Sequence, residues 1–294
     1  MPDPARPYLE VIRAVTYLVP DLRAVEEVYA RWLDYRVVAR GAVPDAVAQA
    51  WRAPTLAGRE AIALEPASAE PVQLRFVAAP EASGWKALTT HGWNVSEIVV
   101  QDVDALAGKL AASPFRIIGP PAGLQRFPMI RAMQVVGPSG ECLYFTEVGP
   151  GSGLNLARAR SFVGRVFIVV AGGPDLDALF DTYAAFGNEF DLPVSTRVRV
   201  ISLANGLPPE TEHAHGLVRL SGGTLIELDQ YPPVTRPRAR VGALHTGMAI
   251  VTFAVDALPS SKSGGASLFE DDRRAVLVTG ATGELIELVE RGDA

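Results

Sequence analysis

The hydrophobic and polar positions of this chain repeat one order of elements. An apolar run at 11–19 has the character of a strand, and after Asp21 the apolar residues from Val25 to Trp32 fall at helical spacing. The helix is expected to end before Tyr35. Shorter strand-like segments follow it at 35–39, 46–51, 61–64 and 72–77, of which 46–51 has the weakest pattern. The first unit is therefore predicted to be β-α-β-β-β.

The next stretch of the chain repeats this order. Strands are expected at 94–100, 115–118, 132–136 and 142–148, and a helix is expected at 103–110. These elements form a second β-α-β-β-β unit.

Two further units are expected after a break in the pattern. The third runs from an apolar stretch at 162–170 to Tyr231, with a hairpin through 221–223. The fourth begins near His245 and closes with a strand at 285–289. Its helix is predicted to be short or distorted, because the sequence SSKSGGAS stands where that helix would continue.

The second half of the chain resembles the first. The segment VPDLRAVEEVYARWLDYRVV, from Val19, matches GPDLDALFDTYAAFGNEFDL, from Gly173, at an offset of 154 positions, and His91 and His245 keep that offset. Such self-similarity indicates an internal duplication. We expect a tail at 1–8, an N-terminal pair of units at 9–149, a Gly-rich polar linker at 150–161 and a C-terminal pair of units at 162–294.

The closing strands carry the most specific motifs. The segments GGTLIELDQ, at 222–230, and GATGELIELVE, at 280–290, end on an I-E-L strand, and helices open on PDL and DVDAL. Four units with these motifs resemble the vicinal oxygen chelate superfamily of glyoxalases, extradiol dioxygenases and bleomycin-resistance proteins. The resemblance covers nearly the whole chain. It implies an α+β fold in which four tandem βαβββ modules form two cupped mixed sheets with flanking helices.

The resemblance also implies a metal on the floor of a cup. In that superfamily the Glu of I-E-L and a His or Gln of a first strand are usual ligands, which here points to Glu227, Glu287 and His245, with His215 as a possible fourth member. This set suits a divalent Mn, Fe, Ni or Zn ion. The alternative is that these are solvent-facing carboxylates and hydrogen-bonded histidines.

One expected ligand is missing from the second half. The first strand of the third unit, FVGRVFIVV, offers no His or Gln. Extradiol ring cleavage needs a two-His, one-carboxylate triad that begins there, so a dioxygenase is the less favoured function.

The first half departs further from the metal pattern. Arg75 and Tyr144 stand where the I-E-L glutamates would be, which suits an anionic or phenolic ligand. Glu97 lies among apolar residues, where a raised pKa would make it a general base; the alternative is an Arg75–Glu97 ion pair. Simple alternation places His91, Trp93 and Glu97 on one strand face, and Gln134 is a further candidate for binding substrate.

Charge and composition exclude several classes of function. The 27 basic and 33 acidic residues among 294 give a net charge of −6, which argues against nucleic acid as a partner. The single Cys142 excludes an internal disulfide, and with no apolar run of membrane length we expect a cytoplasmic protein without a membrane partner. No GxGxxG, Walker or GxSxG motif occurs, so no nucleotide cofactor is expected.

Two classes of function remain. The first is a glyoxalase-like lyase or isomerase that acts on a small oxygenated substrate, with aromatic compounds included. In this enzyme a metal, or the group of Arg75, Glu97 and Tyr144, would stabilise an enolate while a carboxylate moves a proton. The second is a non-catalytic protein that binds and sequesters a small molecule. The sequence leaves open a homodimer and which half holds the site.

Overall fold

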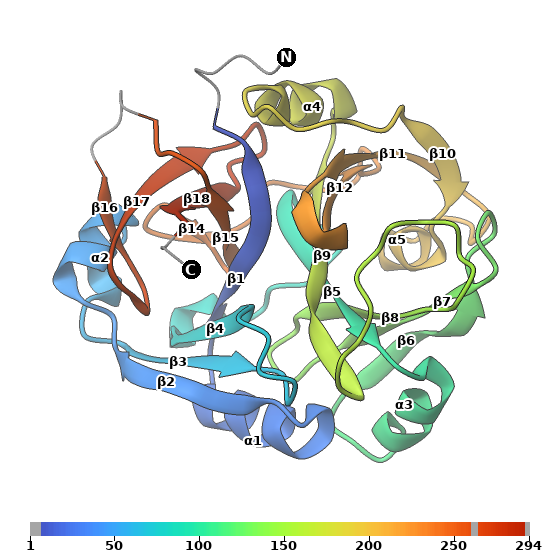
Figure 1. Ribbon diagram of the computed structural model, residues 1–294, viewed down its shortest axis with the longest axis horizontal. Coiled ribbons are helices and arrows are strands. Elements are labelled where there is room, and N and C mark those ends of the chain that lie inside the picture. The colour runs from blue at the N-terminus through green and yellow to red at the C-terminus, as the bar shows by residue number, and fades with distance from the viewer. Residues whose placement is uncertain (1–6, 260–263, 292–294) are drawn as a thin grey trace.

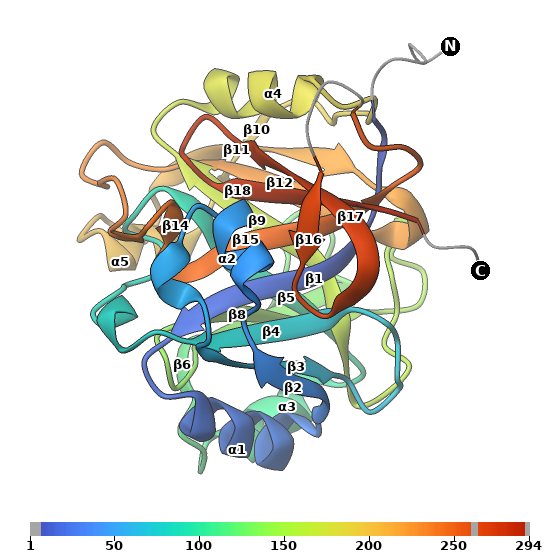
Figure 2. The ribbon, with the colours of Figure 1, turned by 90° about the vertical axis from the view of Figure 1, so that its left-hand side faces the viewer.

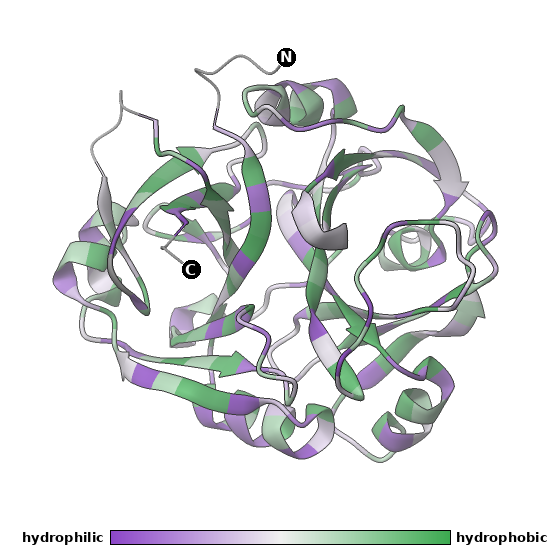
Figure 3. Ribbon diagram, viewed as in Figure 1, coloured by the Kyte–Doolittle hydropathy of each residue, from purple (hydrophilic) through white to green (hydrophobic). Residues whose placement is uncertain are grey.

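Two curled eight-stranded sheets lie side by side in the molecule (Figure 1). The structure is a computed structural model that describes residues 7–259 and 264–291, so the expected tail at 1–8 lies largely outside the described residues. Hydrophobic stretches follow the strands of both sheets (Figure 3). The α+β class with cupped mixed sheets is confirmed.

The first sheet has the strand order β16-β17-β18-β15-β1-β4-β3-β2. It combines the first and fourth units. Its strands are β1 (Leu9–Val19), β2 (Arg36–Ala42), β3 (Glu60–Glu65), β4 (Gln73–Ala78), β15 (Gly247–Val255), β16 (Gly265–Ser267), β17 (Glu270–Thr279) and β18 (Leu285–Glu290).

The second sheet has the strand order β10-β11-β12-β9-β5-β8-β7-β6. It combines the second and third units. Its strands are β5 (Gly92–Val100), β6 (Arg116–Gly123), β7 (Ile130–Val136), β8 (Cys142–Val148), β9 (Val163–Gly173), β10 (Val194–Arg197), β11 (Glu212–Arg219) and β12 (Leu225–Gln230). A small separate sheet pairs β13 (Arg240–Val241) with β14 (Leu244–His245).

Helices α1, α3 and α4 repeat one position in three units. Each follows the first strand of its unit, and each begins at an Asp N-cap, Asp21, Asp102 or Asp175, whose carboxylate accepts a backbone N–H of the first turn. In Figure 1, α1 and α3 lie at one end of the molecule and α4 at the other. The helices are α1 (Leu22–Leu33), α2 (Asp45–Ala50), α3 (Val103–Leu110), α4 (Leu176–Ala184) and α5 (Arg199–Ala204), with short 3-10 turns η1 (Pro54–Leu56), η2 (Pro80–Ala82) and η3 (Ser221–Gly223).

Each sheet takes one unit from each half of the chain. The junctions are antiparallel: Val15 of β1 pairs with Val251 of β15, and Ser96 of β5 pairs with Val169 of β9. The units of one half therefore do not share a sheet, and the candidate residues fall into groups that cross the halves.

One large core joins the two sheets through their convex faces. It contains Tyr17 of β1, Trp93 of β5 and Phe253 of β15, together with Tyr29 of α1 and Tyr183 of α4, all fully buried. The opposite, concave faces are left for the two cups. Burial of this apolar surface is the main stabilisation of the arrangement.

Two expected elements differ from the structure. Residues 46–51 were expected to form a strand, but they lie in and just after helix α2, because Val47, Ala48 and Trp51 fall at helical spacing behind Pro44 and are buried together. In the fourth unit, the described residues between β15 and β16 contain no helix; 260–263 lie outside the described residues. No helix in the described parts of the chain is long and apolar enough to cross a membrane.

Candidate active site

Four equivalent positions face the two cups. They are the central residues of the closing strands, Arg75, Tyr144, Glu227 and Glu287, and each pairs with a residue of the first strand of its own unit. Those partners are Thr16, Glu97, Val170 and Thr252 respectively. We call the concave face that carries Arg75 and Glu287 the arginine cup, and the face that carries Glu97, Tyr144 and Glu227 the carboxylate cup.

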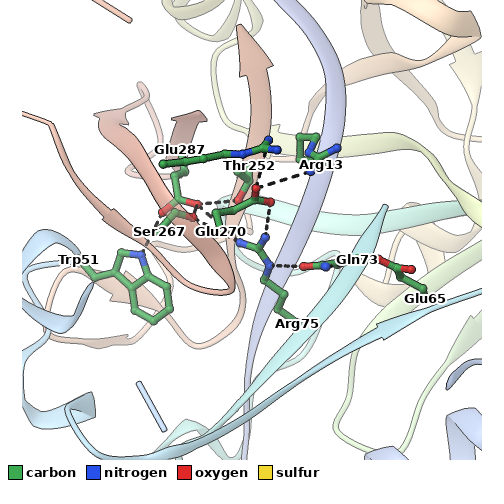
Figure 4. Close-up of polar contacts among 10 residues, drawn as sticks. Arg13, Trp51, Glu65, Gln73, Arg75, Thr252, Ser267, Glu270 and Glu287 are labelled. Atoms are coloured by element: carbon green, nitrogen blue, oxygen red, sulfur yellow. Dashed lines mark hydrogen bonds and ion pairs between the residues drawn. The ribbon is translucent and has the colours of Figure 1, made fainter. Parts of the chain in front are cut away.

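The arginine cup is closed by a buried ion-pair network (Figure 4). The Arg75 guanidinium is 0% exposed and lies 2.7 Å from Glu270 and 3.9 Å from Glu287. Burial lowers the pKa of Arg75, and the charges of Glu287 and Glu270 oppose that shift. Arg75 also donates from Nε to Gln73. The expected Arg75–Glu97 pair does not form, since the two residues lie on different sheets.

The Glu287 carboxylate is held by three hydrogen bonds. One oxygen accepts from Trp51 Nε1 at 3.3 Å, and the other accepts from Thr252 at 2.8 Å and Ser267 at 2.6 Å. Helix α2 lies over this face of the first sheet (Figure 2), and the Trp51 side chain is buried there among apolar residues. A cation is already built into this position as a guanidinium, so the arginine cup does not fit a metal ion.

The carboxylate cup contains a buried acid without a cation. Glu97 is 8% exposed and its carboxylate accepts a hydrogen bond from Thr146 at 2.5 Å, while no described Lys, Arg or His forms an ion pair with it. Burial, followed by the charge of Glu227, raises the pKa of Glu97 to about 8, and the Thr146 hydrogen bond opposes this. Glu97 is therefore mostly protonated at neutral pH.

A second buried acid of the carboxylate cup is Asp229, which is 2% exposed. Burial raises the pKa of Asp229 well above the usual range. The charge of Glu227, a hydrogen bond with Glu227 and the charge of Glu97 raise it further, in that order. Its Oδ1 atom is buried without a partner, as is the hydroxyl of Tyr231. Buried polar atoms are normally paired, so these two are open to a ligand or to water.

Tyr144 and Gln134 complete the polar lining. They pair directly across β7 and β8, and Tyr144 pairs with Glu97 across β8 and β5. Burial raises the pKa of Tyr144, so its hydroxyl stays a hydrogen-bond donor. Three residues expected from the sequence, Glu97, Tyr144 and Gln134, thus meet in one cup, and Glu227 joins them from β12.

The carboxylate cup does not fit a metal ion either. In the described parts of the chain, no group of three or more His, Cys, Asp or Glu side chains is arranged to hold one. Val170 occupies the first-strand position of the third unit, where the fold would place a ligand, and its side chain offers no donor atom. The four expected ligands are dispersed: Glu227 and His215 lie on the second sheet, Glu287 on the first, and His245 on the small sheet.

Of the expected histidines, only His215 lies on the face of the carboxylate cup, because it pairs with Asp229 across β11 and β12. Its Nδ1 is 3.4 Å from Thr196. His245 is 2% exposed beside Gly92, and burial and then the charge of Arg238 lower its pKa to about 3. His91 contacts Thr235 at 3.1 Å.

Trp93 does not share the face of Glu97. The pairing of β5 with β9 shifts register between Trp93 and Val95, and this bulge turns the indole into the core between the sheets, where Nε1 donates to the Leu285 carbonyl at 2.9 Å. The expected alternation fails at this one position. The sequence analysis gave no catalytic or binding role to Asp229 on the cup floor, although Asp229 follows Glu227 by two residues and so shares its strand face.

A cavity of about 490 Å³ lies beside the carboxylate cup, over the neighbouring row of residues on the same sheet. One wall is the concave face of the second sheet at Ile118, Val136 and Cys142, and the other is formed by the loop at 85–88 and by helix α5. The volume falls in the range of ligand-binding pockets, roughly 300–1,000 Å³.

Gly247 holds one wall of this cavity in place. Its φ is +71°, and a Cβ there would lie 2.1 Å from the ring of Trp85. We expect Gly247→Ala to lower the free energy of unfolding by about 2–3 kcal/mol through backbone strain and displacement of the indole. Urea unfolding checks this, with Gly108→Ala as the control, because nothing lies within 4 Å of a Cβ at that position. Equal stability of the two variants would contradict the expectation.

Comparison with solved structures identifies the architecture. Glyoxalase I from Zea mays matches with a TM-score of 0.63 at 15% identity, over 95% of this chain and 92% of that one. A putative dioxygenase from Bacillus subtilis also gives a TM-score of 0.63 at 13% identity, over 98% of this chain and 87% of that one. The chain has the vicinal oxygen chelate fold.

At these identities the likeness shows the vicinal oxygen chelate fold and not the reaction. No protein-family model matches the sequence, and no curated protein is significantly similar to it. The chemistry must therefore be argued from the two cups.

Proposed function

We propose that the carboxylate cup is the active site of a lyase or isomerase that moves a proton on a small oxygenated substrate. The observation that carries the proposal is Glu97: a buried acid on the concave face, without a cation, whose pKa of about 8 suits proton transfer near neutral pH. The fold shared with glyoxalase I supports this reaction class.

The residues of the cup suit an enolisation. The Tyr144 hydroxyl and the Gln134 amide are donors for a substrate carbonyl oxygen. The Glu227 carboxylate takes a proton from the adjacent carbon, and the electron pair of that C–H bond moves through the new C=C bond to the oxygen. Protonated Glu97 supplies the proton that forms the O–H bond. The reverse transfer at the neighbouring carbon completes an isomerisation, and loss of a leaving group there completes an elimination.

Deuterium exchange tests the proposal without knowledge of the product. In D₂O, wild-type protein is expected to exchange the C–H next to the carbonyl in at least one member of a panel of α-hydroxy and α-keto compounds, as followed by ¹H NMR. Glu97→Gln should slow this exchange by about 10²–10⁴-fold, the usual contribution of a general acid–base. Glu27→Gln, on the exposed face of α1, is the matched control.

Exchange that is unchanged in Glu97→Gln would contradict the proposal. Treatment with EDTA should leave wild-type exchange intact, because neither cup fits a metal, and a loss of activity that Mn, Fe, Ni or Zn restores would contradict the metal-free chemistry. Binding of panel compounds without any exchange would favour the sequestration function. The cytoplasmic location and the homodimer stay predictions.

A further inference from the structure

The cavity next to the carboxylate cup has a composition that selects a type of ligand. We propose that it binds the apolar aromatic body of the substrate, and that Arg116 at its edge binds an anionic group, a carboxylate, on that body. This inference rests on the proposed function only in naming the bound molecule as the substrate; the binding site itself is argued from the cavity.

The strand register places the cavity beside the reacting groups. Cys142 of the cavity wall pairs with Val95 and Val136, and Arg116 pairs with Val136, so all four lie in one row across the sheet. The Glu97–Tyr144–Gln134 row lies two residues further along the strands, roughly 7 Å away. A molecule bound in the cavity therefore lies one row of side chains away from Glu97 and Tyr144.

The same register sets the length of that molecule. Arg116 lies on the edge strand β6, three strands from the β5 strand that carries Glu97. Three strand spacings amount to roughly 14 Å. A ligand with a carboxylate at one end and an oxygenated reacting centre at the other spans this distance when a ring or fused rings lie between them.

The charges of the cavity favour an anion. Of the described residues that line it, two are basic, Arg116 and Lys86, and none is acidic. Lys86 already donates to the Ala204 carbonyl at 3.3 Å, whereas the exposed guanidinium of Arg116 makes no hydrogen bond or ion pair with any described residue. A guanidinium without a partner at the edge of an apolar cavity offers a bidentate site for a carboxylate.

The apolar walls favour an aromatic body. Trp85, Ile118, Val200 and Leu203 surround the space, and the Trp85 Nε1 atom is buried without an acceptor in the described protein. The acidic floor at Glu97 and the basic edge at Arg116 then orient the ligand, with its anion outward and its reacting end inward.

Binding of 2-naphthoate, with neutral 2-naphthamide as its isostere, tests this site independently of turnover. Calorimetry should show that wild-type protein binds 2-naphthoate at least tenfold more tightly than 2-naphthamide. Arg116→Met should weaken naphthoate binding about tenfold and leave naphthamide binding unchanged. Arg23→Met, which removes an exposed arginine of α1, should change neither.

The failure of this inference can be told from failure of the proposed function. Glu97→Gln should keep naphthoate affinity within about twofold of wild type while it slows deuterium exchange by about 10²–10⁴-fold. Equal affinity for the two probes would overturn the anion site, and so would naphthoate binding that Arg116→Met does not weaken. The proposed function would still be tested separately by the deuterium-exchange experiment. Val200→Trp, which fills the cavity, should abolish binding of both probes, and retention of binding there would place the ligand elsewhere.

Discussion

Replacement of Arg75 by methionine is expected to lower the free energy of unfolding at pH 7 by about 3–5 kcal/mol, as for the loss of one partner from a buried ion pair. The variant leaves Glu287 and Glu270 buried, 1% and 8% exposed, without the guanidinium that lies between them.

Urea unfolding at pH 7 measures this effect. The double variant Arg75→Met, Glu287→Gln should recover part of the lost stability, because Glu287 has no other ion pair among the described residues. Glu270, in contrast, keeps its ion pairs with Arg13 and Arg273 at 3.5 and 3.4 Å.

Arg40→Met is the matched control, since Arg40 pairs with Glu26 of α1 and Glu60 of β3 at the exposed surface, and its loss should change stability far less than the loss of Arg75. If Arg75→Met is as close to wild type in stability as Arg40→Met, the network does not stabilise the arginine cup.

Replacement of Glu97 by glutamine is expected to stabilise the protein at alkaline pH. The pKa of Glu97 is raised from an ordinary 4.5 to about 8 in the folded protein, so the folded state holds this proton where the unfolded state has released it. The contribution of the Glu97 proton to the free energy of unfolding is fully present below pH 4.5, falls as the pH rises, and is lost above pH 8. The amide carries no proton to lose, so Glu97→Gln should exceed wild type by on the order of 4 kcal/mol at pH 9.

Chemical unfolding of both proteins at pH 5 and pH 9 checks this prediction. At pH 5 the two should differ little, and the difference should open between pH 5 and pH 8. The exposed variant Glu27→Gln should follow the wild-type profile throughout. A Glu97→Gln variant whose advantage is the same at both pH values would show that Glu97 does not hold its proton in the folded state.

Much of the fold could be predicted from the sequence because each unit carries local sequence motifs for its helices and strands. Asp21, Asp102 and Asp175 each begin a helix, and the closing strands at 225–230 and 285–290 share the I-E-L motif after a glycine-containing turn. The strand expected at 46–51 was wrong because a short, Ala-rich apolar segment suits either state, and its helical spacing matters only once Trp51 packs into the arginine cup.

Which candidate site residues lie together could not be predicted from the sequence. Which units share a sheet depends on the contacts of β1 with β15 and of β5 with β9, far apart in sequence and without a motif. The partner of Arg75 is Glu270, which no repeat marks, and the bulge that buries Trp93 depends on the same β5–β9 pairing. Glu97, Tyr144 and Gln134 were found because they lie on neighbouring strands of a single unit.

Each sheet combines one unit from each half of the chain, and this arrangement explains how two different cups can exist in one protein. In a protein of half this length, the strands equivalent to β1 and β15 would meet only across a dimer, and symmetry would make both cups identical. Joining the two copies in one chain removes that constraint, because a substitution then enters one cup and not the other. Arg75 faces Glu287 in one cup while Glu97 faces Glu227 in the other, an asymmetry that a symmetric dimer of one gene product cannot adopt.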